Sequence, residues 1–243
     1  PPDQVLPLRS FVSYERGDFK ALALLVGVAT DESDQTRVVR LRAKRAKGVE
    51  PLTDEEIGHL RGLAEPGADL CAVDAALDKG NTALAREITG AWVDARSQPF
   101  RAARLLRLLR LEGKLADAET VATFAAPSRE VLVQRVLISS TDEKGAERAA
   151  SLIDDRLGPE REFWQIYVTS RRGDGDKASA LLGAVRPPAF DSPLALRLAA
   201  LYAMAEVGDQ ERAEPMLRVL EEKFPKNPDL AAIKGRLDQR TRK

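Results

Sequence analysis

The sequence predicts an all-α fold, and three of its features carry that prediction. Apolar residues recur at helical spacing along most of the 243 residues, as in the stripes over 100–111 and 194–205. Alternation of apolar and polar residues, which marks a half-buried strand, is hard to find anywhere in the chain. Glycines that can end a helix recur about every 33 residues from Gly80 onward.

The expected helices follow one another with short connections. Ser33 and Thr53 have the chemistry of N-caps, and Thr53 with Glu56 forms a capping box. Pro159 and Pro193 stand where the first turn of a helix tolerates a missing N–H. We expect helices over 3–15, 18–28, 34–47, 53–64, 68–78, 82–95, 99–111, 115–125, 129–139, 146–157, 160–171, 176–185, 193–206, 210–223 and 228–239.

A fixed glycine period divides most of the chain into units. From Gly80 the intervals are 33 residues to Gly113, 32 to Gly145, 30 to Gly175 and 33 to Gly208. Five residues after each glycine stands an alanine, the small residue that close packing of two antiparallel helices requires. These alanines are Ala85, Ala118, Ala150, Ala180 and Ala213. A period of this size predicts a repeat architecture.

The units resemble the tetratricopeptide repeat (TPR) family, whose unit is a helix, a tight turn and a second helix in about 34 residues. The last unit carries the resemblance best, with Gly208-Asp209 at its turn and apolar or small residues at the family's places, namely Leu201, Met204, Ala213 and Leu217, before Pro225. The resemblance implies a right-handed α-solenoid of about seven stacked antiparallel helix pairs.

The quality of the resemblance divides the chain into three parts. The resemblance is good over about 67–240 and weak before it, and Asp69 stands where a large apolar residue is usual. We therefore expect divergent N-terminal helical repeats over 1–66, TPR-like repeats over 67–225, and a C-terminal capping helix and tail over 226–243.

Composition excludes several classes of protein. The chain has 38 Lys and Arg against 38 Asp and Glu, and this zero formal charge argues against a chain built mainly to hold nucleic acid or an anionic membrane. One Cys and one His exclude an intramolecular disulfide and a zinc site built from four Cys or from paired Cys and His residues. The chain begins with Pro1 rather than Met, and we expect a signal, an anchor or another domain before it. Richness in Ala, Leu and Arg suggests a bacterium with a GC-rich genome; cytoplasm and cell envelope both stay open.

No catalytic, cofactor or metal site can be assembled from the sequence. His59 has no nucleophile motif beside it, so a structural or surface role is expected for it. Cys71 is expected in the core. The Arg-Gly-Asp triplets at 16–18 and 172–174 fit turns between paired helices, where Gly ends one helix and Asp caps the next, better than adhesion motifs.

Positive charge is concentrated in one segment, 37–47, which holds six cations and no acid. Such a helix either docks on anionic lipid, nucleic acid or an acidic partner, or forms a solvated face balanced by the acids of 54–56. We favour the solvated face and expect no nucleic-acid partner. The candidate basic patch comprises Arg37, Arg40, Arg42, Lys44, Arg45 and Lys47.

The resemblance also implies a concave groove lined by the first helix of each pair. The groove-facing positions of the family correspond in this sequence to Asp74, Asp78 and Glu206, and to a partner-binding set that comprises Arg107, Arg110, Arg135, Ser139, Gln165, Thr169, Arg172 and Tyr202. The middle of that groove is then cationic and suits an extended or helical segment with acidic residues, because Arg binds carboxylates bidentately. Alternatively, these arginines solvate the surface or pair with acids of neighbouring repeats.

Two functions follow as hypotheses. The first is a non-catalytic scaffold or adaptor that binds a protein or peptide partner in the groove. The second is a regulatory or recruiting domain of a larger enzyme or of a membrane-anchored bacterial envelope protein. Membrane contact is then expected only through a missing anchor or the basic helix. An enzyme in its own right is the weakest hypothesis, and no cofactor is expected.

Overall fold

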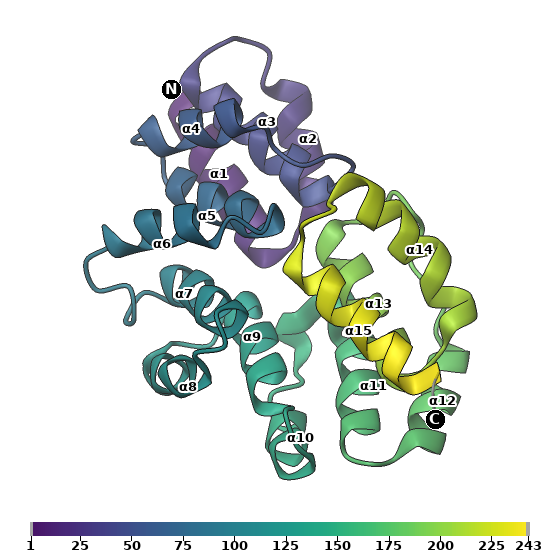
Figure 1. Cartoon of the computed structure of the whole chain (residues 1–243). Helices are drawn as coiled ribbons and strands as arrows, with labels where there is room; N and C mark the ends of the chain where they lie inside the picture. Colours follow the sequence, from purple (N-terminus) through teal and green to yellow (C-terminus); the bar gives the residue numbers. More distant parts are fainter. Residues whose placement is uncertain (1, 242–243) are drawn as a thin grey trace.

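The computed structural model describes residues 2–241, and within this range helices follow one another without a strand (Figure 1). The all-α prediction is confirmed. Residues 242–243 of the predicted tail lie outside the described range. The α-helices are α1 (Pro2–Arg16), α2 (Phe19–Val28), α3 (Asp34–Lys47), α4 (Asp54–Gly62), α5 (Ala68–Asp78), α6 (Thr82–Gly90), α7 (Pro99–Leu111), α8 (Leu115–Phe124), α9 (Arg129–Ser139), α10 (Glu143–Ala150), α11 (Arg161–Arg171), α12 (Gly175–Ala184), α13 (Leu194–Val207), α14 (Gln210–Lys223) and α15 (Pro228–Thr241), and the 3-10 helix η1 (Asp155–Glu160) precedes α11.

The caps read from the sequence form as expected at two helix starts. The Ser33 side chain accepts a hydrogen bond from the Thr36 N–H at the start of α3. Thr53 and Glu56 make the complete capping box of α4, in which the Thr53 N–H donates to the Glu56 carboxylate at 2.7 Å. Each cap satisfies backbone N–H groups that have no partner inside the helix.

Two predicted helices differ from the structure. The helix expected over 82–95 ends at Gly90. The helix expected over 146–157 is α10, which begins earlier and ends at Ala150. Asp142 caps α10 by accepting from the Gly145 N–H at 2.6 Å, so Gly145 lies inside the helix and does not end the previous one. A Cβ on Gly145 would lie 1.7 Å from the Ser139 carbonyl oxygen, which explains the glycine by close packing.

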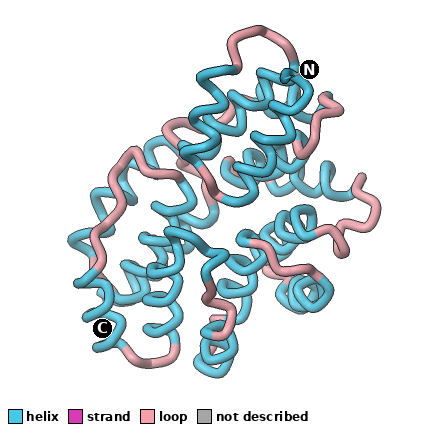
Figure 2. Tube along the Cα trace, turned by 180° about the vertical axis from the view of Figure 1, so that it is seen from behind, coloured by secondary structure: helices cyan, strands magenta, loops and turns pink. Residues whose placement is uncertain are grey.

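The helices pack in two layers. Odd-numbered helices contact one another in order along the chain, as α5 with α7, α7 with α9, α11 with α13 and α13 with α15. Even-numbered helices contact the odd-numbered helix before and after them, as α8 with α7 and α9, and α12 with α11 and α13. Loops join these neighbours at the edges of the layers (Figure 2). The odd-numbered helices therefore form an inner layer, covered by the even-numbered ones.

The two ends of the inner layer meet, so that α1 to α5 lie beside α13 to α15 (Figure 1). The Arg197 guanidinium on α13 donates to the carbonyls of Lys47 and Gly48 at 2.9 and 2.7 Å. Gly48 and Gly80 both have positive φ, and a Cβ there would lie 2.5 Å from the Leu194 Cβ and 2.3 Å from the Lys226 carbonyl oxygen, respectively. These two turns need glycine both for their backbone conformation and for the close approach of the C-terminal third.

The apolar core follows the inner layer. Its largest cluster joins α9, α11, α13, α14 and α15 around the rings of Trp164, Tyr167 and Tyr202. Helix α5 is buried nearly all round, including Asp74 and Asp78. Within residues 2–241, no helix combines the length and the apolar character needed to cross a membrane.

Candidate functional site

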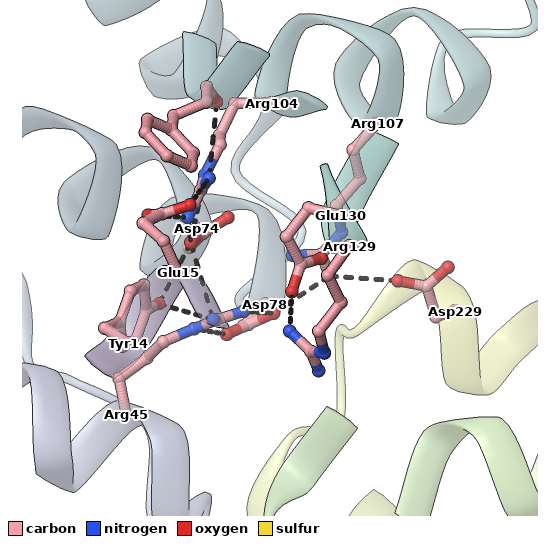
Figure 3. A network of polar contacts seen from close by, with 11 residues as sticks. Tyr14, Glu15, Arg45, Asp74, Asp78, Arg104, Arg107, Arg129, Glu130 and Asp229 are labelled. Carbon is pink, nitrogen blue, oxygen red and sulfur yellow. Dashed lines mark hydrogen bonds and ion pairs between the residues drawn. The ribbon is translucent and has the colours of Figure 1, made fainter. Parts of the chain in front are cut away.

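A buried polar network occupies the inside of the inner layer (Figure 3). Every member belongs to an odd-numbered helix, and arginines alternate with acids from one end of the layer to the other. We call this the inner network; it comprises Tyr14, Glu15, Arg45, Asp74, Asp78, Arg104, Arg107, Arg110, Gln134, Tyr202 and Asp229.

Arg104 organises the half of the inner network nearest the N-terminal helices. Its guanidinium donates to both oxygens of Glu15 at 2.7 and 2.8 Å and to Asp74 at 2.8 Å. The Tyr14 hydroxyl donates to Asp74 at 2.9 Å, and Arg45 donates to Asp78 at 2.8 Å. These bonds tie α1, α3, α5 and α7 together.

Asp229 organises the other half. Its carboxylate accepts from Arg107 at 2.9 Å, from Arg110 at 2.6 Å and from the Tyr202 hydroxyl at 2.7 Å. Arg107 also donates to Asp78 at 2.8 Å. Helix α7 is therefore joined to α15 by ion pairs between residues more than a hundred positions apart in sequence.

The charges of the inner network are fixed by their neighbours. Burial opposes ionisation of Asp74, but Arg104 and Arg45 outweigh it and hold the pKa of this carboxyl well below its usual range. Burial likewise opposes ionisation of Asp229, whose pKa is lowered by Arg110 and Arg107. Burial dominates at Glu15 and raises the pKa of this carboxyl despite its pairing with Arg104. The adjoining cavity of about 80 Å³ has room only for a few water molecules. The inner network therefore has the character of a structural clasp.

The structure distributes the predicted partner-binding set over several places. Arg107, Arg110 and Tyr202 meet in the inner network, where their polar groups are already bound to acids of the same chain. The half-buried Arg135 and Ser139 lie on α9 outside that network. The remaining three line a separate hollow of about 200 Å³ beside Lys177; they are Gln165, Thr169 and Arg172.

A turn two residues earlier than expected explains part of this distribution. The turn after α11 is made by Gly173, which has a φ of 86°, whereas Gly175 is the first residue of α12. Five residues after Gly173 stands Ala178, which is fully buried, while the expected packing residue Ala180 is exposed. Groove positions assigned by their distance from Gly175 therefore lie on a different face of α11 from the one that lines the central cavity.

On two helices, the residue that lines the central cavity is the neighbour of the predicted one. On α9, Gln134 lines the central cavity and accepts from Arg110 at 3.0 Å, while its neighbour Arg135 does not line it. On α11, Trp164 lines that cavity and Gln165 does not. The sequence reasoning missed Arg104, Gln134 and Arg171, although the apolar stripes of α9 and α11 contain the signal for the correct face.

The basic segment 37–47 is divided by the helical period. Arg42 is fully buried, donates to the Pro7 carbonyl at 2.8 Å and the Ser10 hydroxyl at 2.7 Å, and lies over the Phe11 ring. Arg45 belongs to the inner network. These two arginines hold α3 against α1 and α5, so they are not part of an accessible basic patch.

The other four cations of this segment form an outward stripe on α3, which comprises Arg37, Arg40, Lys44 and Lys47. Lys44 pairs with Glu56 at 2.9 Å, as the solvated-face interpretation expects, and Arg40 pairs with Glu32 at 3.1 Å. No ion-pair partner for Arg37 or Lys47 lies among the described residues.

A hollow of about 430 Å³ lies between this stripe and α2. We call it the α2–α3 hollow. Apolar side chains that include Phe19, Leu22 and Val26 line it together with Lys44 and Lys47. Asp191 and Pro193 of the loop before α13 complete the lining, and α2 also exposes two large apolar residues, Leu24 and Val28, by 76% and 66%. The α2–α3 hollow thus combines an apolar floor with a basic wall.

The remaining candidates have structural surroundings. His59 is half-buried, and its Nε2 lies 3.4 Å from the carboxylate of the exposed Asp34. Cys71 is fully buried, and burial raises the pKa of its thiol to about 11. Among residues 2–241, no group of three or more His, Cys, Asp or Glu side chains is placed to hold a metal ion.

Comparisons with protein-family models, with curated proteins and with solved structures found no match. The resemblance to tetratricopeptide repeats therefore rests on the sequence pattern alone.

Proposed function

We propose that this chain is a non-catalytic interaction module, a scaffold or adaptor, built as a right-handed α-solenoid of TPR-like helix pairs. The two-layer packing, with odd-numbered helices inside and even-numbered helices outside, supports the solenoid. The single observation that carries the function is the α2–α3 hollow, an apolar cleft beside Lys47, a cation without an ion-pair partner among the described residues.

The partner is a protein segment with one large apolar side chain next to acidic residues. Apolar surface exposed in a contiguous cleft is typical of a binding site, because solvated surfaces rarely keep such patches without use. A leucine or phenylalanine fits against Leu22 and Val26, and a carboxylate beside it reaches Lys47, which has no acid of its own among the described residues. The acidic partner expected from the sequence is retained, but its proposed binding surface moves from the predicted groove to the α2–α3 hollow.

A peptide-display selection against the immobilised protein tests this proposal. We expect enriched peptides to pair a large apolar residue with Asp or Glu. We expect binding to be lost when Ala23, in the lining of the α2–α3 hollow, is replaced by glutamate, because the added carboxylate occupies the hollow and repels the peptide.

A matched control is Ala180→Glu, which adds the same charge at an exposed alanine within α12. Peptide binding that survives Ala23→Glu but is lost in Ala180→Glu would place the docking surface elsewhere. A selection that enriches no acidic, apolar-containing peptide would contradict the proposed partner chemistry.

A further inference from the structure

A second hollow, of about 370 Å³, lies where α9, α11, α13 and α15 meet. Its floor is apolar, with Leu115, Leu137 and Ile233 among the lining residues. Its polar lining includes Arg171, Glu206 and Arg236. We call it the Glu206 hollow, and it shares no residue with the α2–α3 hollow.

Positive charge exceeds negative charge at this place. Three guanidiniums converge on the single carboxylate of Glu206, which is 2% exposed. Arg236 Nε donates to it at 2.7 Å, Arg240 Nη2 donates at 2.9 Å, and Arg171 Nη1 lies 3.7 Å away. Arg110 also lines the hollow, but Asp229 already compensates its charge. One carboxylate cannot balance three guanidiniums, so the hollow keeps an electrostatic preference for an anion.

The arginines are held in place before any ligand arrives. Arg171 donates through Nε to the Ser140 carbonyl at 2.7 Å and through Nη2 to the Thr141 carbonyl at 2.6 Å. Its third nitrogen, Nη1, is left facing Glu206 at a distance too long for a hydrogen bond. A guanidinium fixed in this way loses little conformational entropy on binding an oxyanion.

A buried hydroxyl without a partner provides an independent observation. Ser140 is 1% exposed and lines the Glu206 hollow, and its Oγ has no hydrogen-bond partner among the described residues. Buried polar groups are nearly always paired, so the unpaired Ser140 hydroxyl marks incomplete hydrogen bonding in the wall of the hollow.

We propose that the Glu206 hollow binds an oxyanion, the carboxylate or phosphate group of a ligand whose apolar part contacts Leu137 and Ile233. The anion receives charge-assisted hydrogen bonds from Nη1 of Arg171 and Nη1 of Arg236, the two nitrogens of these guanidiniums that do not donate to Glu206 or to a backbone carbonyl. This site is separate from the proposed partner surface and does not depend on it.

Titration of the whole chain with inorganic phosphate and, separately, with succinate tests the site. Binding is followed by calorimetry and by the NMR signals of the arginine Nε–Hε groups, at constant ionic strength with chloride as the balancing anion. We expect saturable binding of at least one of the two anions and shifts of the Arg171 and Arg236 signals. Saturation by phosphate alone or by succinate alone identifies the class of oxyanion, and saturation by both assigns the shared chemistry.

Two variants separate a ligand site from nonspecific attraction. Arg236→Gln should weaken binding at least about tenfold, the effect of losing one charge-assisted hydrogen bond. Ala232→Glu places a carboxylate on α15 in the lining of the hollow and should abolish binding while raising the melting temperature, because it compensates the excess charge. Ala231→Glu adds the same charge next to it at an exposed position that does not line the hollow, and should leave binding within about twofold of wild type. No saturable binding of either anion, or equal binding by the Ala232→Glu and Ala231→Glu proteins, would overturn the proposal.

Discussion

Replacing Asp229 by asparagine removes the charge on which the closure of the inner layer depends. The carboxylate is 5% exposed and accepts hydrogen bonds from Arg107, Arg110 and Tyr202 at 2.6 to 2.9 Å. Removal of one partner from a buried ion pair costs about 3–5 kcal/mol, because the remaining charge stays buried without compensation. Arg107 keeps its bond to Asp78, so we expect the lower end, about 3 kcal/mol.

Urea unfolding at pH 7, followed by circular dichroism, measures this loss. The matched control is Asp155→Asn, since Asp155 pairs with Arg161 at the surface and its side chain is 94% exposed. Exposed pairs of this kind contribute at most about 1 kcal/mol. Combining Asp229→Asn with Arg110→Gln should cost less than the sum of the two single changes, because the double variant no longer buries the unpaired guanidinium of Arg110. An Asp229→Asn loss no larger than that of Asp155→Asn would refute the clasp.

Three further predictions concern the backbone, the pH dependence and the thiol. Gly80→Ala should destabilise the protein by at least about 2 kcal/mol, because Gly80 has a positive φ and the added Cβ would meet the Lys226 carbonyl oxygen. Gly113→Ala should cost only about 1–2 kcal/mol, because Gly113 has a φ of 73° but no atom lies within 4 Å of the added Cβ. Equal losses of stability would contradict the close approach at Gly80. Asp74 and Asp229 have lowered pKa values in the folded protein, so they stabilise the fold above their unfolded pKa and lose this contribution as pH falls through the folded values, whereas the raised pKa of Glu15 makes its protonation favour the fold. Urea midpoints should therefore stay constant from pH 7 to about 5 and fall below about pH 4. A steep fall already at pH 6 would contradict this prediction. The single cysteine, fully buried with its pKa raised to about 11, should not react with a thiol reagent until the protein unfolds, and reaction within minutes in the native state would show that it is accessible.

Most of the secondary structure could be predicted from the sequence because its signals are local. Caps such as Ser33 and Thr53, and glycines at helix ends, act within one turn of the chain. Apart from 82–95 and 146–157, the predicted helix bounds lie within two residues of those in the structure. The second of these exceptions arises because Gly145 was expected to end a helix, whereas it lies inside α10.

The faces of the helices were harder to predict, because a shift of one residue turns a helix by about 100°. Asp74, Arg107 and Tyr202 line the central cavity, and each stands six residues before the glycine that ends its helix.

The closure of the chain could not be predicted from local pattern. From the sequence, Arg107 is equally compatible with a groove position and with an ion pair inside the chain. Its ion-pair partner Asp229 lies in a helix that the sequence places at the far end of the repeats. The choice is made by tertiary packing, which brings α15 against α7. Charge reversal at Arg107 or Arg110 therefore tests stability rather than partner binding.

The central claim is that partners dock in the α2–α3 hollow and not in an open groove between the inner helices. The most direct test is site-specific photocrosslinking in the cells that make the protein. A photoreactive residue at Lys47 lies in the α2–α3 hollow, and the same residue at Arg172 lies at a place that the sequence assigns to the groove. We predict a discrete covalent partner adduct from position 47 that disappears when Ala23→Glu is added, and none from position 172. An adduct from position 172 alone would contradict the account.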